Sequence, residues 1–151
     1  MDNGIRGGAG MRMEQEAKSQ IKNNQIVGNI GLYYVCLELS KMGWNVMPTS
    51  RNAKGVDVVI YSQDAKITHT VQVKALSKRS PVPLGTNPDL LAEFLIICRN
   101  VKNSPEVFIT KPEEIKNLIH IGIKDEKKSY WLQPKSYEGF KDRWEIIGPG
   151  Y

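Results

Sequence analysis

GVDVVIYSQDAKITHTVQVKA, residues 55–75, contains two runs of β-branched residues separated by a short polar segment. Such runs favour β-strands, and the polar segment between them can form a tight turn. A loop of residues 63–66 would place Asp57 opposite Gln72 on the neighbouring strand. A register shift of two residues would still keep Asp57, Gln72 and Lys74 on one face. The sequence therefore predicts a hairpin that gathers three polar groups within two apolar strands.

The three polar groups have two alternative explanations. A buried unpaired charge is costly, so groups of this kind inside a hairpin need partners or water. A carboxylate, an amide oxygen and a backbone carbonyl can hold a hard cation such as Mg²⁺. Lys74 could then orient or deprotonate an attacking water and offset negative charge on a phosphate. The alternative is a hairpin with one solvated face, on which Asp57 and Lys74 form a cross-strand ion pair.

Length and charge limit the classes of protein that need to be considered. With 151 residues, of which 40% are hydrophobic, the chain can form one core, and we expect one domain. Its 21 Lys and Arg against 16 Asp and Glu give a net charge of +5, which favours an anionic partner such as a nucleic acid. Cys36 and Cys98 lie in apolar runs and are expected to be buried free thiols. The sequence has no apolar stretch of membrane-spanning length and no signal peptide, so we expect a cytoplasmic protein without a membrane partner.

The chain on the N-terminal side of the hairpin divides into a leader and a helix. Residues 1–10 are rich in glycine and polar residues, and we expect a disordered leader before a domain at 11–151. A helix is strongest over residues 25–42 and should end at Gly43. Gly28 and Gly31 indicate either the close approach of another element or a helix entry. Apolar residues nearly surround this helix, which predicts burial on most sides, with the main face formed by Ile26, Ile30, Tyr33, Tyr34 and Leu37.

The remaining segments alternate between expected strands and expected helices, which favours an α/β or mixed α+β sheet flanked by helices. Thr110 is expected to cap a helix that runs to about Ile119. Residues 81–83, with two prolines, are expected to form a stiff loop. The other expected strands are 44–48, 93–99, 105–110 and 129–134, with a helical turn at 87–92 and a closing helix at 136–147.

The order of these features resembles the PD-(D/E)XK nuclease superfamily, particularly small prokaryotic members of it. The resemblance rests on G-V-D at 55–57 and Q-V-K at 72–74, preceded by a helix, a glycine and a strand. It implies the restriction-endonuclease-like fold, a mixed β-sheet flanked by helices, and metal-dependent hydrolysis of phosphodiester bonds. By this resemblance Asp57, Gln72 and the carbonyl of Val73 would be ligands of Mg²⁺ or Mn²⁺, and Lys74 would be the catalytic lysine.

Two positions depart from the motif of that superfamily. Gln72 stands where an acidic ligand is usual, and Gly55-Val56 replaces the usual proline. A neutral ligand removes one formal charge, so the site should hold a divalent ion less tightly. Glu38 is the candidate replacement acid, as a catalytic residue and metal ligand, because it lies beside the main apolar face of the helix. The alternative is that Glu38 pairs with Lys41, or lies unpaired at the rim of the helix.

Basic residues follow the hairpin directly. Lys78 and Arg79 precede the proline-rich loop, where they would contact phosphates of a nucleic acid or form an ordinary solvated loop. His69 has the opposite strand parity to Lys74 and is expected to be structural, and His120 needs no function. Tyr130, Trp131 and Trp144 are expected to be packing residues, because basic and aromatic residues do not alternate as in a base-stacking surface.

The leading hypothesis is a Mg²⁺-dependent endonuclease that acts on DNA. A second hypothesis is a nuclease-like protein that binds nucleic acid with little or no catalysis, because Gln72 weakens the metal site. A third is a partner-dependent subunit of a defence or mobile-element complex. Because a double-strand cut usually needs two active sites, the first hypothesis is also compatible with a homodimer.

Overall fold

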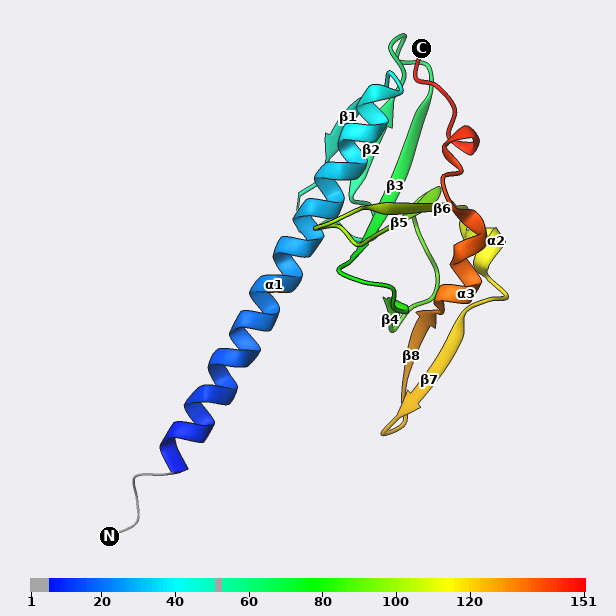
Figure 1. The fold of residues 1–151 in the computed structure, drawn as a ribbon. Helices are drawn as coiled ribbons and strands as arrows, with labels where there is room; N and C mark the ends of the chain where they lie inside the picture. The colour runs from blue at the N-terminus through cyan, green and yellow to red at the C-terminus, as the bar shows by residue number, and fades with distance from the viewer. Residues whose placement is uncertain (1–5, 51–52) are drawn as a thin grey trace.

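A mixed five-stranded sheet lies at the centre of the computed structural model, which describes residues 6–50 and 53–151 (Figure 1). The strand order is β1-β2-β3-β5-β6, and only the β3–β5 pair among these neighbours is parallel. The strands are β1 (Asn45–Pro48), β2 (Val58–Tyr61), β3 (Thr68–Leu76), β5 (Phe94–Arg99) and β6 (Glu106–Thr110). The expected class, an α/β fold with a mixed sheet flanked by helices, is confirmed.

One long helix, α1 (Arg6–Lys41), covers one face of this sheet, and its N-terminal half extends past the sheet (Figure 1). Val27, Val35 and Leu39 recur at multiples of four residues and are buried against the sheet. The helix ends just before Gly43, whose φ of +94° suits a residue without a side chain, as the sequence predicts. Residues 6–10 of the predicted leader belong to α1, whereas residues 1–5 lie outside the described residues.

The predicted burial of α1 on most sides is wrong. Tyr33 is 64% exposed and Leu37 is 55% exposed, although both were expected on the main apolar face. The sheet contacts the helix from one side only, and no element among residues 6–50 and 53–151 covers the outer side. An apolar residue count therefore overestimates burial when a helix packs on a single layer.

A smaller antiparallel sheet lies against the opposite face of the central sheet. Its strands are β4 (Val82–Gly85), β8 (Lys127–Leu132) and β7 (His120–Lys124), in the order β4-β8-β7. The loop expected at residues 81–83 instead contributes to β4, because proline is tolerated in a strand that lies at the edge of a sheet. Strand β7 was not anticipated, and residues 87–92 form no helical turn.

Short helices complete the C-terminal half. They are α2 (Pro112–Ile115), α3 (Pro134–Tyr137), and two 3₁₀ turns, η1 (Glu138–Phe140) and η2 (Trp144–Ile146). The cap of α2 is Lys111 rather than Thr110, and the Lys111 N–H donates to Glu114 Oε1 at 2.9 Å. The predicted closing helix is interrupted because Asp142, at a φ of +52°, turns the chain between the two 3₁₀ segments.

Two hydrophobic cores lie on the two faces of the central sheet. One is formed between α1 and the face that carries Val71, Ile96 and Ile109. The other joins Ile97 and Phe108 to the small sheet and to Tyr137. Among the described residues, no helix has the length and apolar character needed to cross a membrane.

Candidate functional site

Asp57 lies at the start of β2, and the hairpin register brings it beside β3. Val58 pairs with Val71 in the predicted register, and Asp57 directly precedes Val58, outside the regular strand pairing. The Asp57 N–H donates to the Val71 carbonyl at 2.9 Å. The Val73 N–H donates to Asp57 Oδ2 at 2.7 Å. Because this side chain accepts from the backbone of β3, the carboxylate is held at the end of the strand pair.

Thr49, directly after β1, fixes the backbone on the other side of Asp57. Its N–H donates to the Asp57 carbonyl at 2.9 Å, and its Oγ1 donates to the Val56 carbonyl at 2.6 Å. These two bonds close the loop that leads into β2. Sequence analysis missed Thr49, because a threonine in a polar loop carries no signal of such a contact.

Gln72 and Lys74 lie on one face of β3, and the intervening residues lie on the other. Val71, Val73 and Ala75 pack into the core beneath α1, and the alternation of a strand directs Gln72 and Lys74 away from that core. Both polar side chains are half-buried, and neither makes a hydrogen bond or ion pair with another described residue. No contact within residues 6–50 and 53–151 therefore occupies their functional groups.

The Val73 carbonyl lies on the Asp57 side of β3, because a strand residue directs its N–H and C=O to the same side. The candidate donors are thus a carboxylate oxygen, an amide oxygen and a carbonyl oxygen. All three are hard oxygen ligands of the kind that Mg²⁺ accepts, although they carry only one formal negative charge. Within residues 6–50 and 53–151, no group of three or more His, Cys, Asp or Glu side chains is placed to hold a metal ion.

The structure does not bring Glu38 to this group. Glu38 belongs to α1, which covers the face of β3 opposite to Gln72 and Lys74. Its Oε1 lies 3.2 Å from Nζ of Lys41, as in the alternative explanation for this residue. Burial raises the pKa of the Tyr34 phenol, and the charge of Glu38 adds to that increase. Glu38 therefore lies in a helix-side cluster with Lys41 and Tyr34.

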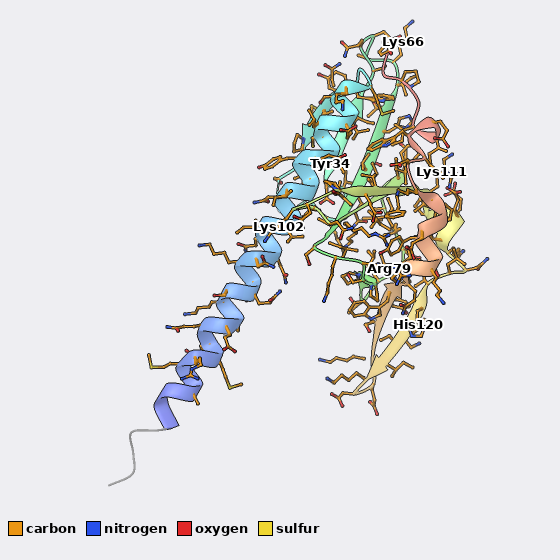
Figure 2. The ribbon with its side chains drawn as sticks, in the orientation of Figure 1. Tyr34, Lys66, Arg79, Lys102, Lys111 and His120 are labelled. Carbon is orange, nitrogen blue, oxygen red and sulfur yellow. The ribbon has the colours of Figure 1, made fainter. Side chains whose placement is uncertain are left out.

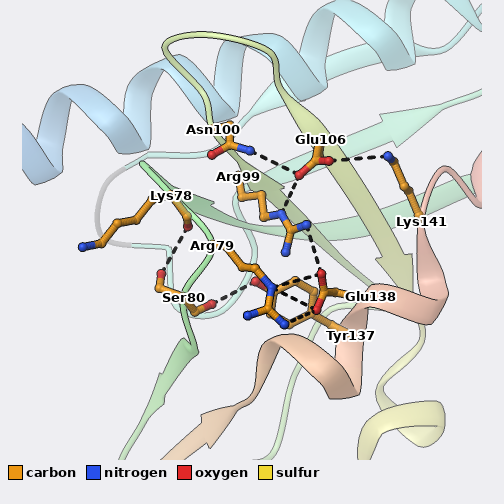
Figure 3. A network of polar contacts seen from close by, with 9 residues as sticks. All are labelled: Lys78, Arg79, Ser80, Arg99, Asn100, Glu106, Tyr137, Glu138 and Lys141. Carbon is orange, nitrogen blue, oxygen red and sulfur yellow. Dashed lines mark hydrogen bonds and ion pairs between the residues drawn. The ribbon is translucent and has the colours of Figure 1, made fainter.

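Arg79 takes part in an ion pair within the chain, whereas Lys78 is exposed and pairs with no residue that the structure describes (Figure 3). Arg79 Nη2 donates to Glu138 Oε1 at 2.7 Å, and its Nε donates to the same carboxylate at 3.2 and 3.3 Å. These bonds raise the pKa of the Arg79 guanidinium. The Arg79 side chain is still 54% exposed, so the ion pair orients the arginine without removing it from the surface.

Arg99 is more buried than Arg79 and joins β5 and β6 to the C-terminal segment (Figure 3). Its side chain is 9% exposed, and Nε donates to Glu106 Oε2 at 2.6 Å while Nη2 lies 3.1 Å from Glu138 Oε2. The guanidinium also lies 4.8 Å from the ring centre of Phe108. Burial alone would lower the pKa of Arg99, but the bonds to its carboxylates raise that pKa above its ordinary value.

Sequence analysis did not identify this Arg99 network, because its members are distant in the chain. Glu138 contacts both Arg79 and Arg99, so it ties the segment after β3 to the end of β5. Tyr137 adds a hydrogen bond from its hydroxyl to the Ser80 carbonyl at 2.9 Å. The network therefore holds the basic segment that follows Lys74 against the body of the protein.

The histidine at position 69 is structural, as its strand parity indicates. His69 Nδ1 lies 2.7 Å from Glu93 Oε2, and its ring packs edge-on against Trp44 and Phe94. It lies on the α1 side of the sheet, away from Lys74. His120 is exposed at the start of β7.

Comparison with known proteins adds information on the fold. No protein-family model matches the chain, and no curated protein matches its sequence. Among solved structures, the chain is similar to a bacterial homing endonuclease, I-Ssp6803I, with a TM-score of 0.57 and 16% sequence identity. The similarity covers 82% of this chain and 89% of the endonuclease chain. The chain therefore has a fold similar to that of a homing endonuclease.

Proposed function

We propose that the protein is a metal-dependent nuclease of the PD-(D/E)XK type that hydrolyses phosphodiester bonds in DNA. The observation that carries this proposal is the hydrogen bond from the Val73 N–H to the Asp57 carboxylate, which holds that carboxylate beside the stretch of β3 that carries Gln72 and Lys74. The fold similarity to a homing endonuclease supports it. The net charge of +5 and the exposed side chains of Lys78 and Arg79 support an anionic polymer as the substrate.

Each residue of the site has a distinct role in this proposal. Asp57, the Gln72 amide oxygen and the Val73 carbonyl would hold Mg²⁺ or Mn²⁺. When bound, such an ion would stabilise charge on the phosphate and lower the pKa of a coordinated water. Lys74 would orient the attacking water, accept its proton at Nζ or offset charge on the phosphate. Lys78 and Arg79 would bind phosphates that flank the cleaved bond.

The test is cleavage of supercoiled and linear DNA in Mg²⁺ or Mn²⁺ by the wild type, Lys74→Ala and Lys66→Ala. Lys66 is the matched control, because it is exposed at the end of the molecule where β3 begins, whereas Lys74 lies near the other end of β3 (Figure 2). We expect Lys74→Ala to lose about 10²-fold or more in rate, as when a proton-transferring group is removed, and Lys66→Ala to cleave normally. Absence of cleavage by the wild type in every metal, or equal cleavage by Lys74→Ala, would contradict the proposal.

A second variant tests the part played by Gln72. Gln72→Glu restores a formal charge to the set of oxygen donors, so it should lower the Mg²⁺ concentration needed for half-maximal cleavage. Light scattering of the same samples would test the further proposal of a homodimer, which would bring two sites to one duplex. A cytoplasmic location is also proposed, supported by the free thiols of Cys36 and Cys98, which are typical of a reducing compartment.

A second candidate function is DNA binding without hydrolysis. It is favoured by the single carboxylate of the donor set and by the lack of a larger acidic group in the described part of the chain. In that case DNA binding would depend on salt but would be unchanged by EDTA, and no metal would produce cleavage.

A further inference from the structure

The hairpin of β7 and β8 projects from the body at the end of the molecule toward which β3 runs (Figure 1). We propose that this hairpin is a second DNA-binding element, which lies lengthwise in the major groove and contacts phosphates through its lysines. The proposal takes DNA as the ligand from the proposed function, but it does not require hydrolysis. The major groove of B-form DNA is wide enough to admit a two-stranded β-ribbon.

Lysine side chains flank the hairpin close to its turn. Lys124 and Lys127 are directly opposite each other across the two strands, and Lys128 follows. Like charges in opposed positions destabilise a strand pair, so the chain retains a local repulsion that a phosphate would relieve. None of these three exposed lysines forms an ion pair with another residue in the described part of the chain.

The turn itself carries the opposite charge and thereby limits the orientation of the hairpin on DNA. Asp125 and Glu126 form a two-residue turn with φ values of 52° and 64°. Their carboxylates would be repelled by phosphates if the hairpin entered the DNA end-on. In a lengthwise orientation with Ile123 toward the floor of the groove, Lys124 and Lys127 lie on the opposite face, from which their long side chains would reach phosphates at the rim, and the turn lies beyond the contact.

One face of the hairpin carries two exposed isoleucines beyond the point where Tyr130 packs against the body. Ile121 is 51% exposed and Ile123 is 70% exposed, and they share this face with Lys128, because Ile123 pairs directly with Lys128. Trp131, on the other face, is 36% exposed and its Nε1 donates to Ser129 Oγ at 2.9 Å. Apolar side chains in the major groove contact thymine methyl groups, so this face suits the floor of the groove.

The position of the hairpin connects it to the candidate site. Lys78 and Arg79 lie a few residues before β4, and β4 pairs with β8, so the basic segment after Lys74 leads into the small sheet. Arg79 lies nearer to His120 than to Lys66, which is at the far end of the molecule (Figure 2). A DNA duplex bound at Lys74 could therefore extend past the segment with Lys78 and Arg79 and contact the β7–β8 hairpin.

The test compares DNA binding by Lys124→Gln/Lys127→Gln with a matched control, Lys41→Gln/Lys66→Gln. The control removes the same charge from exposed lysines at the far end of the molecule. Both pairs are introduced into the Lys74→Ala protein, and affinity for a duplex is measured in EDTA over a range of salt concentrations. Each phosphate contact contributes about 0.9 to the slope of log affinity against log salt. We expect the hairpin variant to lose about 1.8 from this slope and the control to lose none.

Several outcomes would overturn the proposal. These are an unchanged slope, an equal loss in both variants, no duplex binding by the parent protein, or equal competition by double-stranded RNA. RNA duplexes are informative because their major groove is too deep and narrow for such a ribbon. Because both positions are exposed and repel each other, the substitutions should leave thermal stability unchanged or raised. A reduced salt slope in the hairpin variant, without DNA cleavage by the wild type, would contradict only the proposed nuclease activity. Cleavage by the wild type with an unchanged salt slope in the hairpin variant would contradict only the proposed DNA contact of the hairpin.

Discussion

The contact between α1 and β3 depends on the absence of a side chain at Gly31. A Cβ built at this position would lie 2.5 Å from Cβ of Ala75 and 3.5 Å from Cγ1 of Val101. Carbon atoms in a packed core are about 3.5–4.0 Å apart, so the first distance is shorter by about 1 Å. Because Cβ of Ala75 cannot rotate away, relief of the clash requires α1 or β3 to move. We therefore expect Gly31→Ala to be destabilising.

The magnitude follows from two opposing effects. Alanine in a helix interior is more favourable than glycine by about 1 kcal/mol. Overpacking a core costs about 1–3 kcal/mol, and a clash that moves the backbone belongs at the upper end of that range. The net loss in the free energy of unfolding is therefore about 2 kcal/mol for Gly31→Ala. For Gly28→Ala, a Cβ would have no neighbour within 4 Å, so we expect a gain of about 0.5–1 kcal/mol.

Urea unfolding of the wild type, Gly31→Ala, Gly28→Ala and Gly31→Ala/Ala75→Gly measures these effects. The double variant removes the atom that the new methyl group meets, so the two substitutions should show a favourable coupling energy. Equal stability of Gly28→Ala and Gly31→Ala, or the absence of coupling with Ala75→Gly, would refute the argued contact. Because Ala75 follows Lys74, Gly31→Ala should also reduce any activity that depends on that lysine.

Three further predictions concern stability and reactivity. Thr49→Val removes the hydroxyl bond to the Val56 carbonyl and should lower the free energy of unfolding by about 1 kcal/mol, whereas Thr49→Ser should retain most of it in the same urea measurement. The bond from Arg99 lowers the pKa of Glu106, so its stabilising contribution is complete above the ordinary glutamate pKa of about 4.3 and is lost as the pH falls below it. Glu106→Gln should therefore weaken the acid sensitivity of the melting temperature between about pH 5 and 3, and an identical pH profile would contradict this. Burial raises the pKa of the Cys98 thiol to about 11, so a thiol reagent at pH 8 should modify Cys98 only after denaturation, as read by mass spectrometry of peptides.

Local signals predicted the parts of the fold that depend on neighbouring residues. The hairpin register could be predicted because the loop between β2 and β3 is short and determines which residues pair. The end of α1 at Gly43 followed from the conformational preference of glycine. Gly31 has the predicted close approach to another element, and Gly28, three residues earlier in α1, does not. A sequence contains no local feature that distinguishes them, because the difference is the presence of Ala75 on another strand.

Long-range contacts account for what sequence analysis missed. The Arg99 network joins residues from β5, β6 and η1, and only the folded sheet brings them together. The exposed side of α1 was not predicted, because apolar spacing does not reveal how many layers cover a helix. Gln72 and Lys74 share a face of β3 as predicted, since strand alternation alone determines that, whereas Asp57 lies just before the regular pairing of β2 with β3. Glu38 was predicted as a possible metal ligand from its position on the helix. The sequence does not determine on which side of the sheet that helix packs.

The bond between Asp57 and the Val73 amide affects the choice of an inactive variant for binding studies. If β2 began earlier in the chain, one of its backbone carbonyls would accept the Val73 N–H. The Asp57 carboxylate accepts that N–H instead. Asp57→Ala would leave an amide proton of β3 without an acceptor, at a cost of about 1–3 kcal/mol. Asp57→Asn keeps an oxygen that can accept this N–H but removes the negative charge. It therefore separates the chemical role of the carboxylate from its structural role at the start of β2.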